Sequence, residues 1–388
     1  MSDRNMSLCG AIQMQTLRVT IPAREACYAI QVHSANLGAI GEFARSCVAK
    51  SELALVVCDA AVKSYADVVL QALEQQGFRS SLAVVPSGES SKSLEMAARL
   101  YDALIELPAD RQTLIVAVGG GVIGDLAGFV AATFNRGLPL LMVPTTLLAM
   151  VDSAIGGKVA VNHPRGKNLI GAFYQPVGVW ITLNTLDTLP EREYRSGLAE
   201  VVKYGVIMDA RFFEYVEANV ERILARDKEI LQYIVVHCCR LKANIVEQDP
   251  CEETGLRAIL NYGHTFAHAF ETLGSYSEWL HGEAVAVGMI CASRLAEKLG
   301  RIPGEVTERQ RNLLRRLGLP VQLKFMPVDE LLAIMRHDKK ARAGRLRFIL
   351  PNRIGCVELV ENVPESLVRE TLLELMNSSQ ETTACTRQ

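Results

Sequence analysis

The fold of this chain is decided by residues 113–129, which read TLIVAVGGGVIGDLAGF. The apolar start predicts a buried strand, the glycines a tight turn, and the following residues a helix. Gly119, Gly121 and Gly124 fit the pattern GxGxxG, in which backbone amides approach a pyrophosphate at a helix N-terminus. A tight turn without any ligand explains the same glycines. The acidic residue expected about 20 positions later for a ribose is absent between residues 126 and 151. The stretch therefore leaves two alternatives open: a nucleotide loop of another design, or no nucleotide loop.

Short apolar runs alternate with helical patterns on both sides of this stretch. Five runs are expected to be strands: 53–59, 81–87, 113–121, 138–146 and 177–183. Between them, residues 60–77 and 93–107 repeat apolar side chains with the period of a helix. Strands and helices in alternation predict a mostly parallel sheet covered by helices.

The pattern changes after about residue 190, where strand-like runs become rare. Helices are expected at 210–225, 229–249, 282–300 and 307–318. The fold class predicted is an α/β domain followed by a mainly helical domain. We place the first at residues 17–183 and the second at 184–376, with flexible ends at 1–16 and 377–388. Ligand sites favour the cleft between such domains.

Composition narrows the class of function. The chain has 388 residues, 49% hydrophobic and 22% charged, with a net charge of −2. This balance gives no support for a nucleic-acid or membrane-surface role, and no apolar run reaches the length of a membrane span. The N-terminus lacks the basic start and apolar core of a signal peptide. Ten scattered cysteines without a CxxC pair favour a reducing compartment, and we expect a cytoplasmic enzyme.

Three of the seven histidines fall within residues 264–281. His264 and His268 lie four apart in NYGHTFAHAF (261–270), which places both on one face of a helix, and His281 follows in WLHGE. The protease motif with this spacing has a glutamate directly after its first histidine, where this chain has Thr265. Single histidines are most often structural, but three together with a carboxylate suit a catalytic zinc. The spacing alone makes His264 and His268 equal candidates.

Other charged residues are ambiguous when each is considered alone. The loop DSAIGGKVAVNHPRGKN (152–168) holds Lys158 after two glycines but fails the Walker A pattern, so either a solvated loop or a phosphate contact explains it. Glu200 and Lys203 in GLAEVVKYG lie three residues apart. This spacing fits either an ion pair on a helix surface or a metal-binding carboxylate beside a lysine. Further cations have no local explanation: Arg136, Lys242, Arg257, Lys339 and Lys340.

In this order, these motifs resemble the dehydroquinate synthase family of sugar-phosphate cyclases. The likeness runs from about residue 50 to about residue 350. It is carried by PSGESSKSL, GGGVIGDLAGF, GLAEVVKYG, LRAILNYGHTFAHAFE, WLHGEAVAVGM, HDKKARAGRLRFILP and the long block RGLPLLMVPTTLLAMVDSAIGGKVAVNHPRGKNLIGAF. Alanine at position 267 replaces the glycine that is frequent in the family.

The resemblance implies an NAD-binding α/β domain, a helical domain and a site between them. It implies a Zn²⁺ or Co²⁺ ion held by Glu200, His264 and His281. It implies a homodimer in which Arg136 reaches the site of the neighbouring subunit. The residues implied for NAD are Ser87, Gly88, Glu89, Ser90, Ser91, Lys92, Gly121, Val122, Ile123, Gly124, Asp125, Thr145, Thr146, Lys158, Lys167, Thr185, Leu186, Asp187 and Thr188.

The implied substrate is 3-deoxy-D-arabino-heptulosonate 7-phosphate. The family chemistry is transient oxidation at C5 by NAD, β-elimination of phosphate, re-reduction, ring opening and aldol closure, with the metal polarising the C5 oxygen. Lys242 and Arg257 are implied for the substrate carboxylate. For the phosphate the family match gives Lys158, Asn261, His268 and one of Lys339 and Lys340, and for the hydroxyls it gives Asp152, Asn168 and Lys203.

Three competing functions remain. A sister cyclase would act on another sugar phosphate and change the carboxylate-binding cations, and the amino-substrate variant of the same enzyme is harder to separate. A metal- and NAD-dependent polyol dehydrogenase would need no cluster of five or six cations. A non-catalytic relative would be expected to lack a metal ligand or a lysine, and none is missing.

Overall fold

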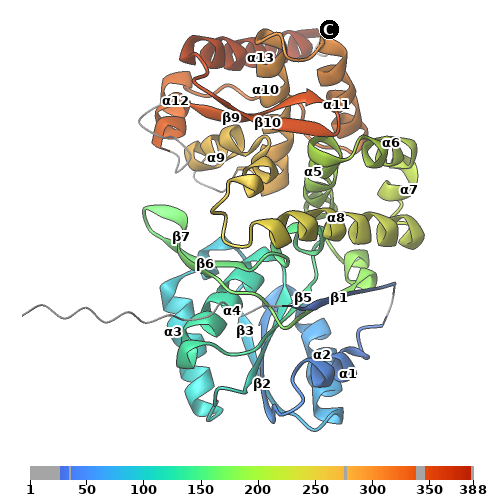
Figure 1. Ribbon diagram of the computed structural model, residues 1–388, viewed down its shortest axis with the longest axis vertical. Helices are drawn as coiled ribbons and strands as arrows, with labels where there is room; N and C mark the ends of the chain where they lie inside the picture. The colour runs from blue at the N-terminus through green and yellow to red at the C-terminus, as the bar shows by residue number, and fades with distance from the viewer. Residues whose placement is uncertain (1–26, 35, 275–277, 338–345, 386–388) are drawn as a thin grey trace, which may run out of the picture.

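The structure is a computed structural model that describes residues 27–34, 36–274, 278–337 and 346–385. A part built around a sheet and a part built of helices lie one above the other in Figure 1. The predicted flexible segment 1–16 lies outside the described residues.

A six-stranded sheet forms the first part, with every neighbouring pair of strands parallel. Its strands, in spatial order, are β1 (Ala29–His33), β8 (Gly178–Thr182), β5 (Leu140–Pro144), β4 (Leu114–Gly119), β2 (Leu53–Asp59) and β3 (Arg79–Val85). The predicted parallel sheet is therefore confirmed. The strand at 53–59 has the predicted bounds, whereas the strand predicted at 81–87 begins and ends two residues earlier. The sequence did not indicate β1, because this short edge strand is polar at alternate positions and only partly buried.

Side chains of the central strands alternate between two apolar layers. Leu55 and Val57 of β2 pack with α3 (Leu94–Glu106) and α4 (Gly121–Thr133). The intervening residues of β2 pack with α1 (Ile40–Cys47) and α2 (Lys63–Gln75). Burial on both faces explains why these strands read as continuous apolar runs.

A two-stranded antiparallel hairpin follows β5 and was not predicted. It consists of β6 (Lys158–His163) and β7 (Gly166–Phe173), and a short π-helix at Ala149–Ser153 precedes it. Most residues of β7 are exposed, so its sequence lacks the apolar alternation of a half-buried strand. The hairpin lies between the sheet and the helical part (Figure 1).

The second part is mainly helical, as predicted. Its helices are α5 (Glu191–Met208), α6 (Ala210–Ala218), α7 (Val220–Leu224), α8 (Lys228–Gln248), α9 (His264–Leu273), α10 (His281–Lys298), α11 (Gly304–Arg316), α12 (Val328–His337) and α13 (Glu365–Cys385). A hairpin of β9 (Arg347–Arg353) and β10 (Cys356–Glu361) packs among them.

Two helices of this part concern the predicted boundaries. The single helix expected at 210–225 is broken at Asn219, which ends α6 and precedes α7. The last helix α13 continues to Cys385, inside the segment 377–388 whose flexibility stays a prediction. Across the described residues, no helix is long and apolar enough to cross a membrane, and the eight cysteines whose side chains the structure describes form no disulfide.

Candidate active site

Most residues predicted to bind NAD gather at one edge of the six-stranded sheet, whereas Lys158 and Lys167 belong to the β6–β7 hairpin. Those at the edge follow the carboxyl ends of four strands: the turn Glu89–Ser91 follows β3, α4 follows β4, Thr145 and Thr146 follow β5, and the turn Leu183–Asp187 follows β8. Carboxyl ends of parallel strands share an edge, which is where open α/β sheets bind ligands. The structure thus brings together segments that are about a hundred residues apart in sequence.

The first turn of α4 is tightly packed but leaves its amides free of side-chain caps. The main chain of Thr145 donates a 2.9 Å hydrogen bond to the carbonyl of Gly119. A Cβ on Gly120 would lie 3.1 Å from Thr146, and a Cβ on Gly121 would lie 3.1 Å from Ser153. The N-cap residue Gly120 makes no side-chain hydrogen bond to the helix. This uncapped N-terminus suits an anionic group such as a pyrophosphate.

A buried lysine joins the segments predicted to bind NAD to the β6–β7 hairpin. Lys92 is only 5% exposed and contacts the carboxylate of Asp125 and the side-chain oxygen of Asn168, the latter at 2.5 Å. Burial raises the pKa of Asp125, and the charge of Lys92 opposes that shift. Asn168, predicted to contact the substrate, is therefore hydrogen-bonded to Lys92, which is predicted to contact NAD and is itself paired with Asp125.

Asp59 at the end of β2 lies against one of the segments predicted to bind NAD and was not itself predicted. Ser87 donates its hydroxyl to the Asp59 carboxylate, so the end of β2 contacts the loop after β3. Nearby, the hydroxyls of Tyr65 and Thr188 are 2.9 Å apart. An acidic residue directly after the apolar run LALVVC was the available signal, but only the strand order places it beside the segments predicted to bind NAD.

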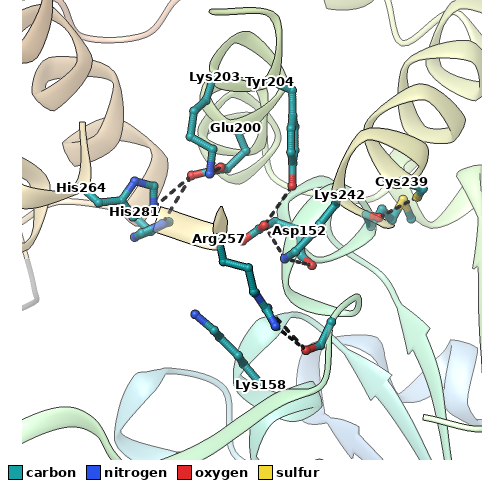
Figure 2. Close-up of polar contacts among 12 residues, drawn as sticks. Asp152, Lys158, Glu200, Lys203, Tyr204, Cys239, Lys242, Arg257, His264 and His281 are labelled. Carbon is teal, nitrogen blue, oxygen red and sulfur yellow. Dashed lines mark hydrogen bonds and ion pairs between the residues drawn. The ribbon is translucent and has the colours of Figure 1, made fainter. Parts of the chain in front are cut away.

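Glu200, His264 and His281 converge from α5, α9 and α10 (Figure 2). The Nε2 atoms of both histidines lie 3.6 Å from Oε1 of Glu200. One ligand atom from each of the three residues lies within 4.8 Å of the others. These side chains come from positions 64 or more residues from the glutamate, and the helix packing alone brings them together.

Glycines allow the close helix packing that forms this group. A Cβ on Gly282 would lie 1.8 Å from the carbonyl oxygen of Ser196, so the start of α10 contacts the backbone of α5 directly. A Cβ on Gly288 would lie 2.3 Å from the carbonyl oxygen of Gly263, which brings α10 equally close to the start of α9. His281 precedes the first contact by one residue, and His264 follows Gly263.

The chemistry of this group fits a divalent metal. Glu200 is fully buried, and neither of its carboxylate oxygens has a hydrogen-bond partner within the described part of the chain, although Lys203 forms an ion pair with Oε2. One carboxylate, two imidazoles and an open position are the ligand set of a catalytic zinc site. Burial alone lowers the pKa of His281, but the carboxylates of Glu200 and Glu271 outweigh it and raise the pKa to about 10. Metal binding here must therefore displace a proton.

His268 lies one helical turn beyond His264, and its position differs from that of the three converging residues. The rings of His264 and His268 stand edge to face with centroids 5.6 Å apart. Among the described residues, the cluster close enough to share a metal contains Glu200, His264 and His281 and leaves His268 out. Asn261 and His268 are both half-buried and lie three residues before and four residues after His264.

Lys242 and Tyr204 hold Asp152 beside the metal group (Figure 2). Nζ of Lys242 lies 2.5 Å from Oδ1 of Asp152, and the Tyr204 hydroxyl donates to the same oxygen at 3.1 Å. Burial alone raises the pKa of Asp152, but Lys242 and Lys203 outweigh it and lower the pKa. Tyr204 was not predicted, because a tyrosine inside an apolar helix carries no local signal of its partner.

Arg257 is almost fully buried where the two parts of the chain meet. Its Nη1 donates to the carbonyl oxygens of Gly156 at 3.3 Å and of Pro250 at 2.9 Å, whereas its Nε has no acceptor among the described residues. Asp249 fixes the preceding loop by accepting hydrogen bonds from the main-chain N–H groups of Glu253, Thr254 and Arg257. Asp249 was also missed, since the fold of its loop is not evident from its sequence.

The remaining predicted residues differ in placement. Lys158 is exposed and forms a 2.6 Å ion pair with Glu252 from the helical part. Arg136 is exposed and forms no ion pair with another described residue. Lys339 and Lys340 lie outside the described residues. The structure thus brings Asp152, Lys203, Lys242 and Arg257 to one region (Figure 2).

Comparisons with known proteins identify the family. The sequence model of the 3-dehydroquinate synthase N-terminal domain matches residues 82–196, and that of the C-terminal domain matches residues 197–341. The chain belongs to the 3-dehydroquinate synthase family. A curated relative from Desulforamulus reducens named 3-dehydroquinate synthase is 48% identical over 354 residues, covering 91% of this chain and 98% of the relative. The resemblance inferred from the motifs is confirmed.

Two solved structures of sugar-phosphate cyclases resemble this 3-dehydroquinate synthase family member. One is 2-epi-5-epi-valiolone synthase from Streptomyces hygroscopicus subsp. jinggangensis with bound NAD⁺ and Zn²⁺, with a TM-score of 0.85 and 28% identity, covering 93% of this chain and all of that one. The other is 2-deoxy-scyllo-inosose synthase with carbaglucose-6-phosphate, NAD⁺ and Co²⁺, with a TM-score of 0.80 and 28% identity, covering 89% and 96% of the two chains. The predicted fold class is therefore confirmed.

Proposed function

We propose that this chain is a 3-dehydroquinate synthase, which converts 3-deoxy-D-arabino-heptulosonate 7-phosphate to 3-dehydroquinate and phosphate in the shikimate pathway. The observation that carries the proposal is the group of buried Glu200, buried His264 and half-buried His281, with Lys203 paired to Glu200 and the buried cations Lys242 and Arg257 in the same region (Figure 2). A metal site beside several buried cations suits an anionic substrate, and the name of the 48% identical relative supports the specific reaction.

Glu200, His264 and His281 would hold Zn²⁺ or Co²⁺, and the segments after β3, β4, β5 and β8 would hold NAD. When bound, the metal supplies a Lewis acid for a substrate hydroxyl and NAD supplies a hydride acceptor. The uncapped start of α4 would receive the pyrophosphate. We assign Asp59 to a ribose hydroxyl, because a carboxylate at the end of a strand neighbouring the glycine turn serves this purpose in related sheets.

The other residues of the site would bind and orient the substrate. Arg257 and Lys242 suit the carboxylate, since both are buried cations and the Nε–H of Arg257 is free to donate to an incoming oxygen. Asp152 is kept ionised by its lysine neighbours and would accept a hydrogen bond from a substrate hydroxyl. The same assignment places Lys203 and Asn168 at the hydroxyls, and Lys158, Asn261, His268 and a lysine among 339 and 340 at the phosphate.

The deciding experiment supplies purified protein with the substrate, a divalent metal and substoichiometric NAD. We expect many turnovers per NAD, with phosphate and dehydroquinate released in equal amounts and no accumulation of NADH. Build-up of NADH in proportion to product would contradict the proposal and indicate a dehydrogenase. A Glu200→Ala variant provides the control for phosphate released without the metal site.

A sister cyclase is the second candidate, because the two solved cyclase structures superpose well on this chain. The buried pair of Arg257 and Lys242 favours a carboxylate substrate over a neutral sugar phosphate. Glucose 6-phosphate offered in place of the acid tests this candidate, and its conversion would support the sister reaction. The amino-substrate variant is tested by offering the corresponding amino analogue in competition.

We also propose a cytoplasmic homodimer in which Arg136 completes the site of the neighbouring subunit. The exposed position of Arg136, without a described ion pair, supports this assignment. Light scattering tests the dimer. Mixing Arg136→Ala with Lys158→Ala tests the shared site, because exchange of subunits should restore activity in hybrid dimers. Full activity of Arg136→Ala alone would contradict it.

A further inference from the structure

Glu271 is a buried carboxylate that the site described so far does not use. It belongs to α9, three residues beyond His268, and is only 6% exposed. Burying an ionised carboxylate costs several kcal/mol unless it is paired. A buried carboxylate of this kind therefore needs partners that account for its charge.

Two cationic or potentially cationic groups reach the same oxygen of Glu271. Its Oε1 lies 3.5 Å from Nδ1 of His281 and 3.8 Å from Nζ of Lys167. His281 begins α10, whereas Lys167 belongs to β7 of the hairpin. Glu271 on α9 thus contacts both His281, a residue of the metal cluster, and Lys167, a residue of the hairpin.

The two nitrogens of His281 face two different carboxylates. Nε2 points to Glu200, and Nδ1 points to Glu271 on the opposite side of the ring. A histidine that binds a metal through one nitrogen almost always donates its other N–H to a carboxylate, a carbonyl or water. That second contact fixes the tautomer and the orientation of the ring. His264 has the matching arrangement, because its Nδ1 lies 3.1 Å from the carbonyl oxygen of Tyr262.

We propose that Glu271 is a positioning residue that holds Nδ1–H of His281, so that Nε2 stays directed at the ion shared with Glu200 and His264. Lys167 keeps the Glu271 carboxylate charged and in place by balancing its buried charge. His281 needs this support more than His264, since its side chain is 31% exposed whereas that of His264 is 10% exposed. The inference rests on the proposed metal site.

The test measures Co²⁺ binding by itself, without substrate or NAD, through chelator competition and the visible absorption of the bound ion. Glu271→Ala should weaken Co²⁺ binding by about 10–100-fold, the usual effect of losing such an outer partner, and should change the absorption spectrum. Glu271→Gln should recover part of that loss, because its amide oxygen can still accept Nδ1–H. Glu297→Ala is the matched control, since Glu297 is a similarly buried, ion-paired carboxylate of the helical part with no contact to the metal cluster.

The outcomes separate the inference from the proposed function. If Glu271→Ala left the Co²⁺ affinity and the absorption spectrum unchanged, the proposed role of Glu271 would be wrong. The same conclusion would follow if Glu297→Ala lost as much Co²⁺ affinity as Glu271→Ala. Neither result would contradict the metal site itself. Failure of the unsubstituted protein to bind Co²⁺ would overturn the proposed metal site and the inference with it. Thermal unfolding of each variant without metal identifies any variant that is simply misfolded, and a folded Glu271→Asp variant then replaces it.

Discussion

The ammonium nitrogen of Lys242 lies 2.7 Å from the main-chain carbonyl oxygen of Asp152 and 2.5 Å from its carboxylate. Lys242 comes from α8 and Asp152 from the π-helix that precedes the hairpin, so this contact ties the two parts of the chain together at the site. Both residues are proposed to bind substrate, and their mutual contact keeps each charge compensated when no substrate is present.

Lys242→Met should therefore reduce stability as well as activity. Leaving the largely buried carboxylate of Asp152 without its closest cation should lower the free energy of unfolding by roughly 1–3 kcal/mol. This loss is smaller than that for breaking a fully buried ion pair, because Lys203 remains nearby. Urea unfolding measures the loss. Lys63→Met removes an exposed helix-surface pair and should change stability by about 0.5 kcal/mol or less. Equal effects of the two substitutions would argue against a structural role for the Lys242–Asp152 contact.

His264→Ala and His268→Ala should differ in metal content. Removing His264 leaves two protein ligands, so metal should be lost during dialysis. His268 lies outside the cluster, and its removal should leave metal near one equivalent while slowing phosphate release. Metal analysis after dialysis distinguishes them. Equal loss of metal in both variants would show that His268 is a ligand, as the helical spacing alone allows.

Arg257→Lys should raise KM for the acid substrate by about 10–100-fold, because a lysine cannot make two charge-assisted hydrogen bonds in one plane, each worth about 1.5–3 kcal/mol. Lysine keeps the charge near the carbonyl of Gly156, which limits structural damage. Steady-state kinetics supply the measurement, with metal content as the check on folding. An unchanged kcat/KM would remove Arg257 from the substrate and favour a cyclase for neutral sugars.

Asp249 should make stability depend on pH at the acid end. Burial alone raises the pKa of Asp249, but main-chain hydrogen bonds from Thr254, Arg257 and Glu253 outweigh it and lower the pKa to about 2. Because the pKa of Asp249 is lower in the folded state, its contribution to folding stability is complete above the unfolded pKa of about 4. That contribution is lost as pH falls through about 2. The Tm difference between the unsubstituted protein and Asp249→Asn should accordingly be largest above pH of about 4 and shrink below it. A difference that stays constant with pH would contradict this account.

Gly282→Ala should separate α10 from α5 and move His281 away from Glu200. Its Cβ would lie 1.8 Å from a backbone oxygen, which no side-chain rotation can relieve, so we expect a loss of about 1–3 kcal/mol or more and weaker Co²⁺ binding. Gly38→Ala is the control, because a Cβ there meets nothing within 4 Å. Unfolding curves and metal titration measure both effects. Normal metal affinity in Gly282→Ala would mean that the packing contact does not set the ligand geometry.

The sequence alone determined the order and type of most elements. Buried strands such as 53–59 are recognisable because both faces of a central parallel strand are apolar, and long helices because their apolar stripe has a fixed period. Motif resemblance also supplied Glu200, His264 and His281. Elements with little burial, such as β1 and β7, were not indicated, since an exposed strand leaves no apolar pattern.

Only the tertiary structure decided which partner each charged side chain has. The contacts of Asp59, Tyr204, Asp249 and Glu271 depend on strand order and on the close approach of helices, and those distances follow from packing rather than from local sequence. Spacing placed His264 and His268 on one helix face, but the position of Glu200 and His281 made one of them the neighbour of the carboxylate. The physical reason is that hydrophobic periodicity specifies how an element is buried, whereas a polar site requires distances of a few ångströms between elements that are remote in the chain.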